Sequence, residues 1–220
     1  MTNSAHEIAK WFIKQGYDQP KNTFDGNMKL QKLLFFSQLI HAAKYGEVLF
    51  SEEMRAFENG TVINSVRLDY KNSYYELVEE AQDFEISDNE EVLKTLKNTV
   101  EIFGDMSAKE LSHLNHELES WKVPYYESLT PIPGVYSKEK NIVNPYNEVF
   151  LKDVEKVRDM LEVYEDNGDY ECEVINGISF YYYSEEVTFT DEIVSMLENL
   201  DCPDSSYFIT YDEEQGYIIS

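Results

Sequence analysis

The stretch MKLQKLLFFSQLIHAAKY, residues 28–45, decides the fold of this chain. Its leucines and isoleucine recur at spacings of three and four, which is the period of an α-helix. Phe35, Phe36 and Leu39 extend the apolar surface almost all the way round this predicted helix. Gly46 follows as a stop signal, because glycine readily adopts the left-handed conformation that ends many helices. We therefore expect a central, buried helix.

Three further helices are predicted from capping boxes, in which a serine is followed three residues later by a glutamate. The boxes are Ser4–Glu7, Ser87–Glu90 and Ser107–Glu110. The helices that they begin are expected to reach about residue 15, residue 103 and about residue 121. Asn64 or Ser65 is expected to begin another helix that runs towards residue 80. Residues 48–62 show no clear period and are expected to be irregular, with a turn at Gly60.

The pattern changes after residues 124–147, where four prolines predict a long connection without regular structure. Residues 149–165 have helical spacing, and two β-rich runs then flank Asn176-Gly177, the dipeptide typical of a two-residue hairpin turn. A short helix capped by Thr190 and two more strands, 207–211 and 217–219, complete the chain. The predicted fold is a mostly α N-terminal domain followed by a small acidic α+β domain with an antiparallel sheet. The expected boundaries are 1–125, 126–147 and 148–220.

The net charge of −25 limits the classes of partner. Residues 151–220 hold 19 acidic and 3 basic residues, so most of the imbalance lies in the last third of the chain. Nucleic acid and anionic membranes would be repelled, whereas a basic protein would be attracted. The chain begins without a secretory signal, lacks an apolar run long enough for a membrane span, and has two distant cysteines, Cys172 and Cys202. We therefore expect a cytoplasmic protein with reduced thiols.

Residue patterns that carry chemistry are weak. His113 and His116, beside Glu117, have a spacing that can place two rings on one side of a helix, but no further ligands are apparent. A core histidine and a surface histidine explain the pair as well. Carboxylate pairs are frequent and therefore uninformative, and no phosphate loop or nucleophile motif occurs. We expect no enzyme, no cofactor and no metal; a hydrolase would require two carboxylates of different pKa in one cleft.

Tyrosine is the other residue type in excess. Phe180 and Tyr182 are expected on the core side of the strand 178–183, which leaves Tyr181 and Tyr183 on the opposite side. Tyrosines among carboxylates are typical of a protein-binding surface. A sheet whose second face is covered by a helix is the alternative.

Residues 27–38, NMKLQKLLFFSQ, resemble the motif N-x-K-L-Q-K-L-L-Y-Y-x-Q of the Panacea domain family, also called SocA-like or phage-associated GepA-like. Residues 50–66 resemble its F-x-E-x-x-x-A-W-x-x-G-P-V-x-x-x-V motif, and residues 111–121 its L-S-x-x-x-H-x-x-x-x-W motif. The matching residues are Asn27, Lys29, Leu30, Gln31, Lys32, Leu33, Leu34, Gln38, Ala56, Phe57, Gly60, Val62, Leu111, Ser112, His116 and Trp121. Phe57 replaces the usual tryptophan and Thr61 the usual proline, and the family's small-residue tail after Trp121 is absent.

The resemblance implies an antitoxin of a prophage-type toxin–antitoxin pair, which neutralises its toxin by direct contact. Such a toxin is expected to be basic or to act on RNA or nucleotides. The candidate partner-binding residues are Arg55, Glu58, Asn64, Tyr181 and Tyr183. Two alternatives remain open: an acidic mimic of nucleic acid that inhibits a host defence enzyme, and an adaptor that delivers a partner to a protease.

Overall fold

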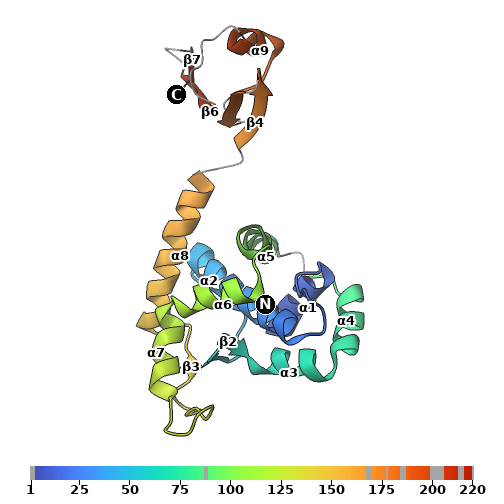
Figure 1. Cartoon of the computed structure of the whole chain (residues 1–220), viewed down its shortest axis with the longest axis vertical. Coiled ribbons are helices and arrows are strands. Elements are labelled where there is room, and N and C mark those ends of the chain that lie inside the picture. Colours follow the sequence, from blue (N-terminus) through green and yellow to red (C-terminus); the bar gives the residue numbers. More distant parts are fainter. Residues whose placement is uncertain are drawn as a thin grey trace. The chain divides into compact units, whose positions relative to one another are not determined.

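The computed structural model describes residues 3–86, 89–166, 170–176, 178–183, 187–198, 206–212 and 216–219. The chain divides into two compact units, Met1–Asp159 and Met160–Ser220 (Figure 1). This division falls inside helix α8 (Glu148–Asp166), whereas the sequence pattern places a boundary at residues 147–148. Among the described residues, none of the helices combines the length and the apolar character needed to cross a lipid bilayer.

Helix α2 (Phe24–Tyr45) is the centre of the first unit, as predicted. Sixteen of its 22 residues are buried, so it contacts other elements on all sides. It begins earlier than the predicted residue 28 because the Thr23 side chain accepts a hydrogen bond from the backbone N–H of Gly26. It ends at Gly46, which has the left-handed φ of 72°.

The capping boxes are confirmed at Ser4 and at Ser107, which begin α1 (Ala5–Lys14) and α6 (Ala108–His116). Ser87 of the remaining predicted box lies outside the described residues. Helix α5 (Glu90–Phe103) has Asn89 as its N-cap, and the Asn89 side chain accepts from the N–H groups of Glu91 and Val92. Figure 1 shows α1, α5 and α6 arranged around α2.

Two predicted helices are each interrupted. The segment from Asn64 forms α3 (Asn64–Asn72) and α4 (Tyr74–Asp83), which meet at the non-helical Ser73. This break lets the hydroxyls of Tyr70 and Tyr74 both donate to buried Asp18 Oδ2, each at 2.9 Å. Helix α6 likewise ends at His116 rather than continuing through Trp121, because Leu118 is extended and begins α7 (Glu119–Ser128).

The prediction that residues 48–62 are irregular is wrong. Strands β1 (Met54–Phe57) and β2 (Gly60–Ile63) form an antiparallel hairpin, and β3 (Ile142–Val143) pairs with β1 in the order β2-β1-β3. All four residues of β2 are buried, so the strand shows no alternation of polar and apolar residues. The prediction of a turn at Gly60 is confirmed, with a φ of 101°.

Residues 124–147 also contain regular structure, contrary to the prediction. Helix α7 continues to Ser128 with Pro124 inside it, and strand β3 lies near the end of the segment. Pro124 removes one backbone donor, yet α7 has tertiary anchors: buried Trp121 donates from Nε1 to the Phe57 carbonyl, and Ser120 N–H donates to Asp153 Oδ2 at 2.7 Å.

The second unit contains a four-stranded sheet in the order β4-β5-β6-β7. Its strands are β4 (Tyr170–Ile175), β5 (Ile178–Tyr183), β6 (Ser206–Asp212) and β7 (Gly216–Ile219). The predicted hairpin at Asn176 is confirmed, with a φ of 53° for that residue. The prediction of an antiparallel sheet is confirmed for the pairs β4-β5 and β6-β7 but is wrong for β5 and β6, which are parallel. Helix α9 (Asp191–Glu198) lies between them in the chain and makes the crossover that a parallel pair requires.

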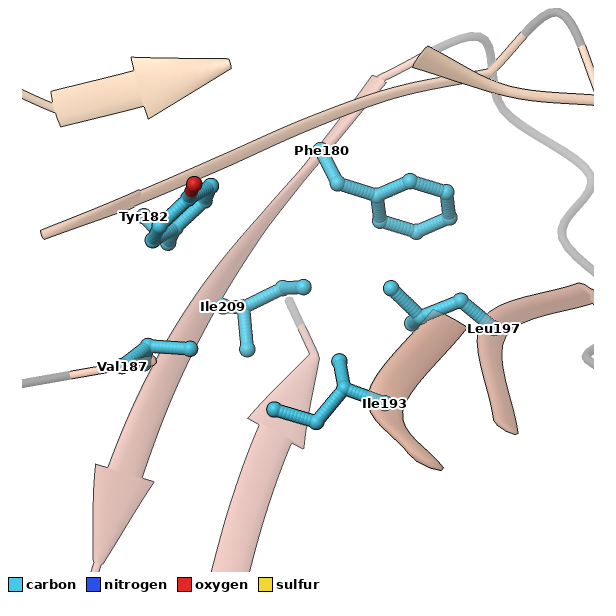
Figure 2. Packing of buried hydrophobic residues seen from close by; sticks show 6 residues of the cluster. All are labelled: Phe180, Tyr182, Val187, Ile193, Leu197 and Ile209. Carbon is cyan, nitrogen blue, oxygen red and sulfur yellow. The ribbon is translucent and has the colours of Figure 1, made fainter. Parts of the chain in front are cut away.

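One face of this sheet packs against α9. The core residues are Phe180, Tyr182, Val187, Ile193, Leu197 and Ile209. Figure 2 shows these side chains converging between the strands and the helix. Phe180 and Tyr182 thus lie on the core side of β5, as predicted from the alternation.

Replacement of Gly60 by alanine is expected to destabilise the fold by about 2–4 kcal/mol, because a Cβ there would press against Asn115 Oδ1 and Lys32 Cε at a positive φ. Gly134→Ala is the matched control, since Gly134 also has a positive φ but faces open space. It should lose only about 1 kcal/mol. Urea unfolding measures both, and equal losses would show that Gly60 is not tightly packed.

Candidate protein-binding surface

Polar side chains of buried α2 bind the backbone of strand β2. Gln31 Oε1 accepts from the N–H of Ile63 at 2.8 Å, and Lys32 Nζ donates to the carbonyl of Thr61 at 3.0 Å. Asn115 of α6 binds Thr61 from the other side, since its Oδ1 accepts the Thr61 N–H and its Nδ2 donates to the hydroxyl. A proline in place of Thr61 would lack that N–H, so threonine adds a contact here.

The other polar residues of this helix also bind main-chain groups. Gln38 is the most engaged: its Oε1 accepts from Leu49 N–H at 2.9 Å and Phe50 N–H at 3.1 Å, and its Nε2 donates to the Phe50 carbonyl. Lys29 Nζ donates to the Gly104 carbonyl at 2.6 Å, and Asn27 Nδ2 to the Arg67 carbonyl at 3.0 Å. These side chains are therefore internal supports rather than a surface offered to a partner.

Contacts from α6 and α7 fix the hairpin turn. Ser112 Oγ donates to the Asn59 carbonyl at 3.0 Å, and Trp121 Nε1 donates to the Phe57 carbonyl at 2.9 Å. His116 stacks on Trp121 with 4.0 Å between ring centroids. The apolar motif residues Leu30, Leu33, Leu34, Ala56, Val62 and Leu111 are all buried. The three sequence motifs thus meet around one buried hairpin.

An aromatic stack continues from this hairpin to the surface. Trp121 stacks on Tyr125 with centroids 4.6 Å apart, and Tyr136 contacts both Tyr125 and Phe57. Tyr126, 64% exposed, meets the edges of Trp121 and Tyr125. The sequence alone does not reveal this role of Tyr136, because its place depends on a contact with Phe57, which is distant in sequence.

The segment between α7 and β3 forms an exposed apolar loop, residues 129–136. Leu129 is 50%, Ile132 64% and Val135 48% exposed. The loop is nevertheless ordered by its own hydrogen bonds: Thr130 Oγ1 donates to the Val135 carbonyl at 2.8 Å, and Leu129 pairs with Tyr136 in a β-bridge. Apolar side chains that gather on one exposed segment favour a protein-binding role for it.

The predicted partner-binding residues lie in different places. Arg55 is engaged internally, because its guanidinium donates to the Lys138 carbonyl and to Asn141 Oδ1, both at 2.6 Å, and pairs with Glu53. It therefore anchors the chain that follows the apolar loop. Glu58 is exposed at the hairpin turn, and Asn64 Oδ1 accepts from Arg67 Nε at 3.2 Å. Tyr181 and Tyr183 belong to the second unit.

Burial alters the acid–base properties of two motif residues. Lys32 is 1% exposed and binds a carbonyl rather than a carboxylate, so desolvation lowers the pKa of its ammonium to about 7. Burial, and then the charge of Lys32, lower the pKa of His116. His113 is exposed whereas His116 stacks on Trp121. Among the described residues no group of three His, Cys, Asp or Glu side chains is placed to hold a metal ion.

Comparison with protein families gave one match. Residues 30–122 match the family described as "Antitoxin SocA-like, Panacea domain". The matched region runs from α2 to the first residues of α7 and contains the hairpin; the apolar loop begins seven residues after its end, beyond the rest of α7. Comparisons with curated proteins and with solved structures gave no match.

Replacement of Gln38 by leucine is expected to destabilise the first unit by about 3 kcal/mol or more, because two buried N–H groups and one carbonyl lose their partner. Gln82→Leu, at an exposed position of α4, is the control and should change stability by less than about 0.5 kcal/mol. Chemical denaturation would contradict this role of Gln38 if both variants unfolded at the same urea concentration.

Lys32 also predicts a dependence of stability on pH. The ordinary pKa of lysine is 10.5 and that of folded Lys32 about 7, so between these values the unfolded chain binds more protons and the free energy of unfolding rises with pH. Lys32→Met removes this contribution. The stability of wild type relative to the variant should therefore increase from pH about 7 upward, and parallel pH profiles would contradict the buried, desolvated ammonium.

Proposed function

We propose that this chain is an antitoxin that neutralises a partner toxin by direct protein–protein binding, because residues 30–122 match the antitoxin SocA-like Panacea domain family. The family description supports an antitoxin role and a protein partner in general terms. The finer proposal, stoichiometric binding that covers the toxin, rests on the surface that the first unit presents. We place this function in the cytoplasm, in line with the expected reduced cysteines.

The observation that carries the proposal is the apolar loop, residues 129–136. Together with Tyr126, it places four large apolar side chains in water within ten residues. Its backbone is bonded internally, and Tyr136 packs on Phe57 of the hairpin. A partner would therefore meet a preformed surface, and little conformational entropy would be lost on binding.

The Panacea domain serves in this proposal as the rigid support of the loop. Arg55 of β1 binds Lys138 and Asn141 just beyond the loop, and α7 continues from the aromatic stack into its start. The buried motif residues act through this support and not through contact with the toxin. Tyrosine is among the residues that commonly contribute most of the binding energy at the centre of an interface, and exposed Tyr126 lies beside the loop.

Co-expression with the product of the adjacent gene tests the proposal, with growth as the readout. The full chain should restore growth if that product is a toxin. A variant with Ile132→Asp and Val135→Asp should lose rescue, because carboxylates would replace the apolar contact. The matched control carries Leu68→Asp and Tyr75→Asp, at exposed positions of α3 and α4, and should rescue like wild type.

Thermal unfolding of both variants confirms that each is folded. No rescue by the full chain would overturn the antitoxin proposal for that pair. Full rescue by the loop variant would show that toxin binding uses another surface.

A further inference from the structure

We infer that the second unit docks a protein surface rich in lysine and arginine, through the face of its sheet that lies opposite α9. This inference deepens the proposed function, since it names the chemistry of a partner surface. The open face is defined by Val174, Ser179, Tyr181, Tyr183, Phe208, Thr210 and Ile218, as follows from the strand register.

The register separates the two faces of the sheet clearly. On neighbouring strands Phe180 lies next to Tyr207, and Tyr182 lies next to Ile209. These residues face the core under α9, and Figure 2 shows Phe180, Tyr182 and Ile209 there. Their neighbours therefore point the other way: Tyr181 beside Phe208, Ser179 opposite Val174, and Thr210 opposite Ile218.

The open face is apolar and aromatic at its centre. Val174 is 64% and Ile218 38% exposed, on the two edge strands. Between them Tyr183 and Phe208 contact edge to face, with centroids 5.2 Å apart. Tyrosine combines a large apolar area with a hydroxyl and few rotatable bonds, which suits a protein interface.

The negative charge of the second unit indicates which kind of partner binds the open face. Residues 160–220 contain 16 Asp and Glu and no Lys, Arg or His, so all 18 basic residues of the chain precede this unit. Nucleic acid and anionic lipid would be repelled by this charge. A second copy of the unit would also be repelled, because its like charges would be brought together. A basic protein surface has the complementary charge.

The two properties serve different steps of binding. Exposed carboxylates such as Glu162, Glu173 and Glu198 accelerate the encounter with a cationic partner by long-range attraction, which salt weakens. They need not lie on the open face: Glu173 pairs with core residue Phe180, and Glu198 belongs to α9. The apolar face then slows dissociation, because its contacts are short-ranged and insensitive to salt. Binding should therefore weaken, but not vanish, as salt rises.

Fluorescence anisotropy of the full chain with a labelled arginine- and leucine-containing peptide tests the inference. In the control peptide glutamate replaces arginine. The charge variant is Glu162→Gln, Glu173→Gln and Glu198→Gln in the second unit. Its matched control, Glu76→Gln, Glu79→Gln and Asp83→Asn, removes the same charge from exposed positions of α4.

The face variant is Val174→Ser with Ile218→Ser, and its control is Leu68→Ser with Leu151→Ser, at exposed positions of the first unit. Wild type should bind the cationic peptide and not the acidic one. The dissociation constant should rise about fivefold or more in each second-unit variant and less than about twofold in each control, at low salt.

Absence of binding by wild type would overturn the inference. Equal losses in variant and control would also overturn it, because the net charge of the chain alone would then explain the attraction. Neither result bears on rescue in co-expression. If the full chain did not rescue growth but the second unit still bound the cationic peptide, the antitoxin proposal would fail while this inference would stand.

Discussion

The first unit depends on polar side chains of helix α2 that satisfy the backbone of a hairpin buried beside it. Buried N–H and carbonyl groups without partners cost free energy, and β2 is buried at all four positions. Gln31, Lys32 and Asn115 provide these partners from both sides of the strand. Lys32 does so at the cost of desolvating its ammonium, which the lowered pKa records. These hydrogen bonds fix a single register for the hairpin, and thereby the positions of the segments that contact it.

This arrangement separates support from recognition. The polar motif residues lie inside the first unit, where they contact backbone groups. Trp121 stacks on Tyr125 and Phe57 contacts Tyr136, so the buried hairpin is connected to aromatic side chains nearer the surface. The exposed apolar loop lies outside the matched region, beyond the end of α7. The internal framework and the exposed loop are therefore separate parts of the first unit. The acidic second unit fits the same principle, since its sheet and its charge are independent of the motif.

Local sequence signals predicted the elements that depend on local interactions. The Ser4 and Ser107 caps, buried α2 and the Asn176 turn are of this kind. The hairpin at residues 54–63 was missed because each of its strands has only four residues and β2, buried at every position, shows no alternation. The parallel pairing of β5 with β6 was missed because it joins segments distant in sequence. Arg55 was predicted to bind a partner, and the sequence could not show that its guanidinium also binds Asn141, 86 residues away. Residues 129–136 were predicted to be part of an irregular connection because they contain two prolines. The sequence did not show that Thr130 Oγ1 donates to the Val135 carbonyl and so fixes the loop.

Native-state amide hydrogen exchange of the full chain tests the central claim most directly. The amides of Thr61 and Ile63 donate to Asn115 and Gln31, and those of Leu49 and Phe50 donate to Gln38. If side chains of the helical core hold this segment, these four amides should exchange only when the whole unit unfolds, with the same opening free energy as the amides at the centre of α2. Exchange by a local opening of lower free energy, while α2 stays protected, would contradict the account.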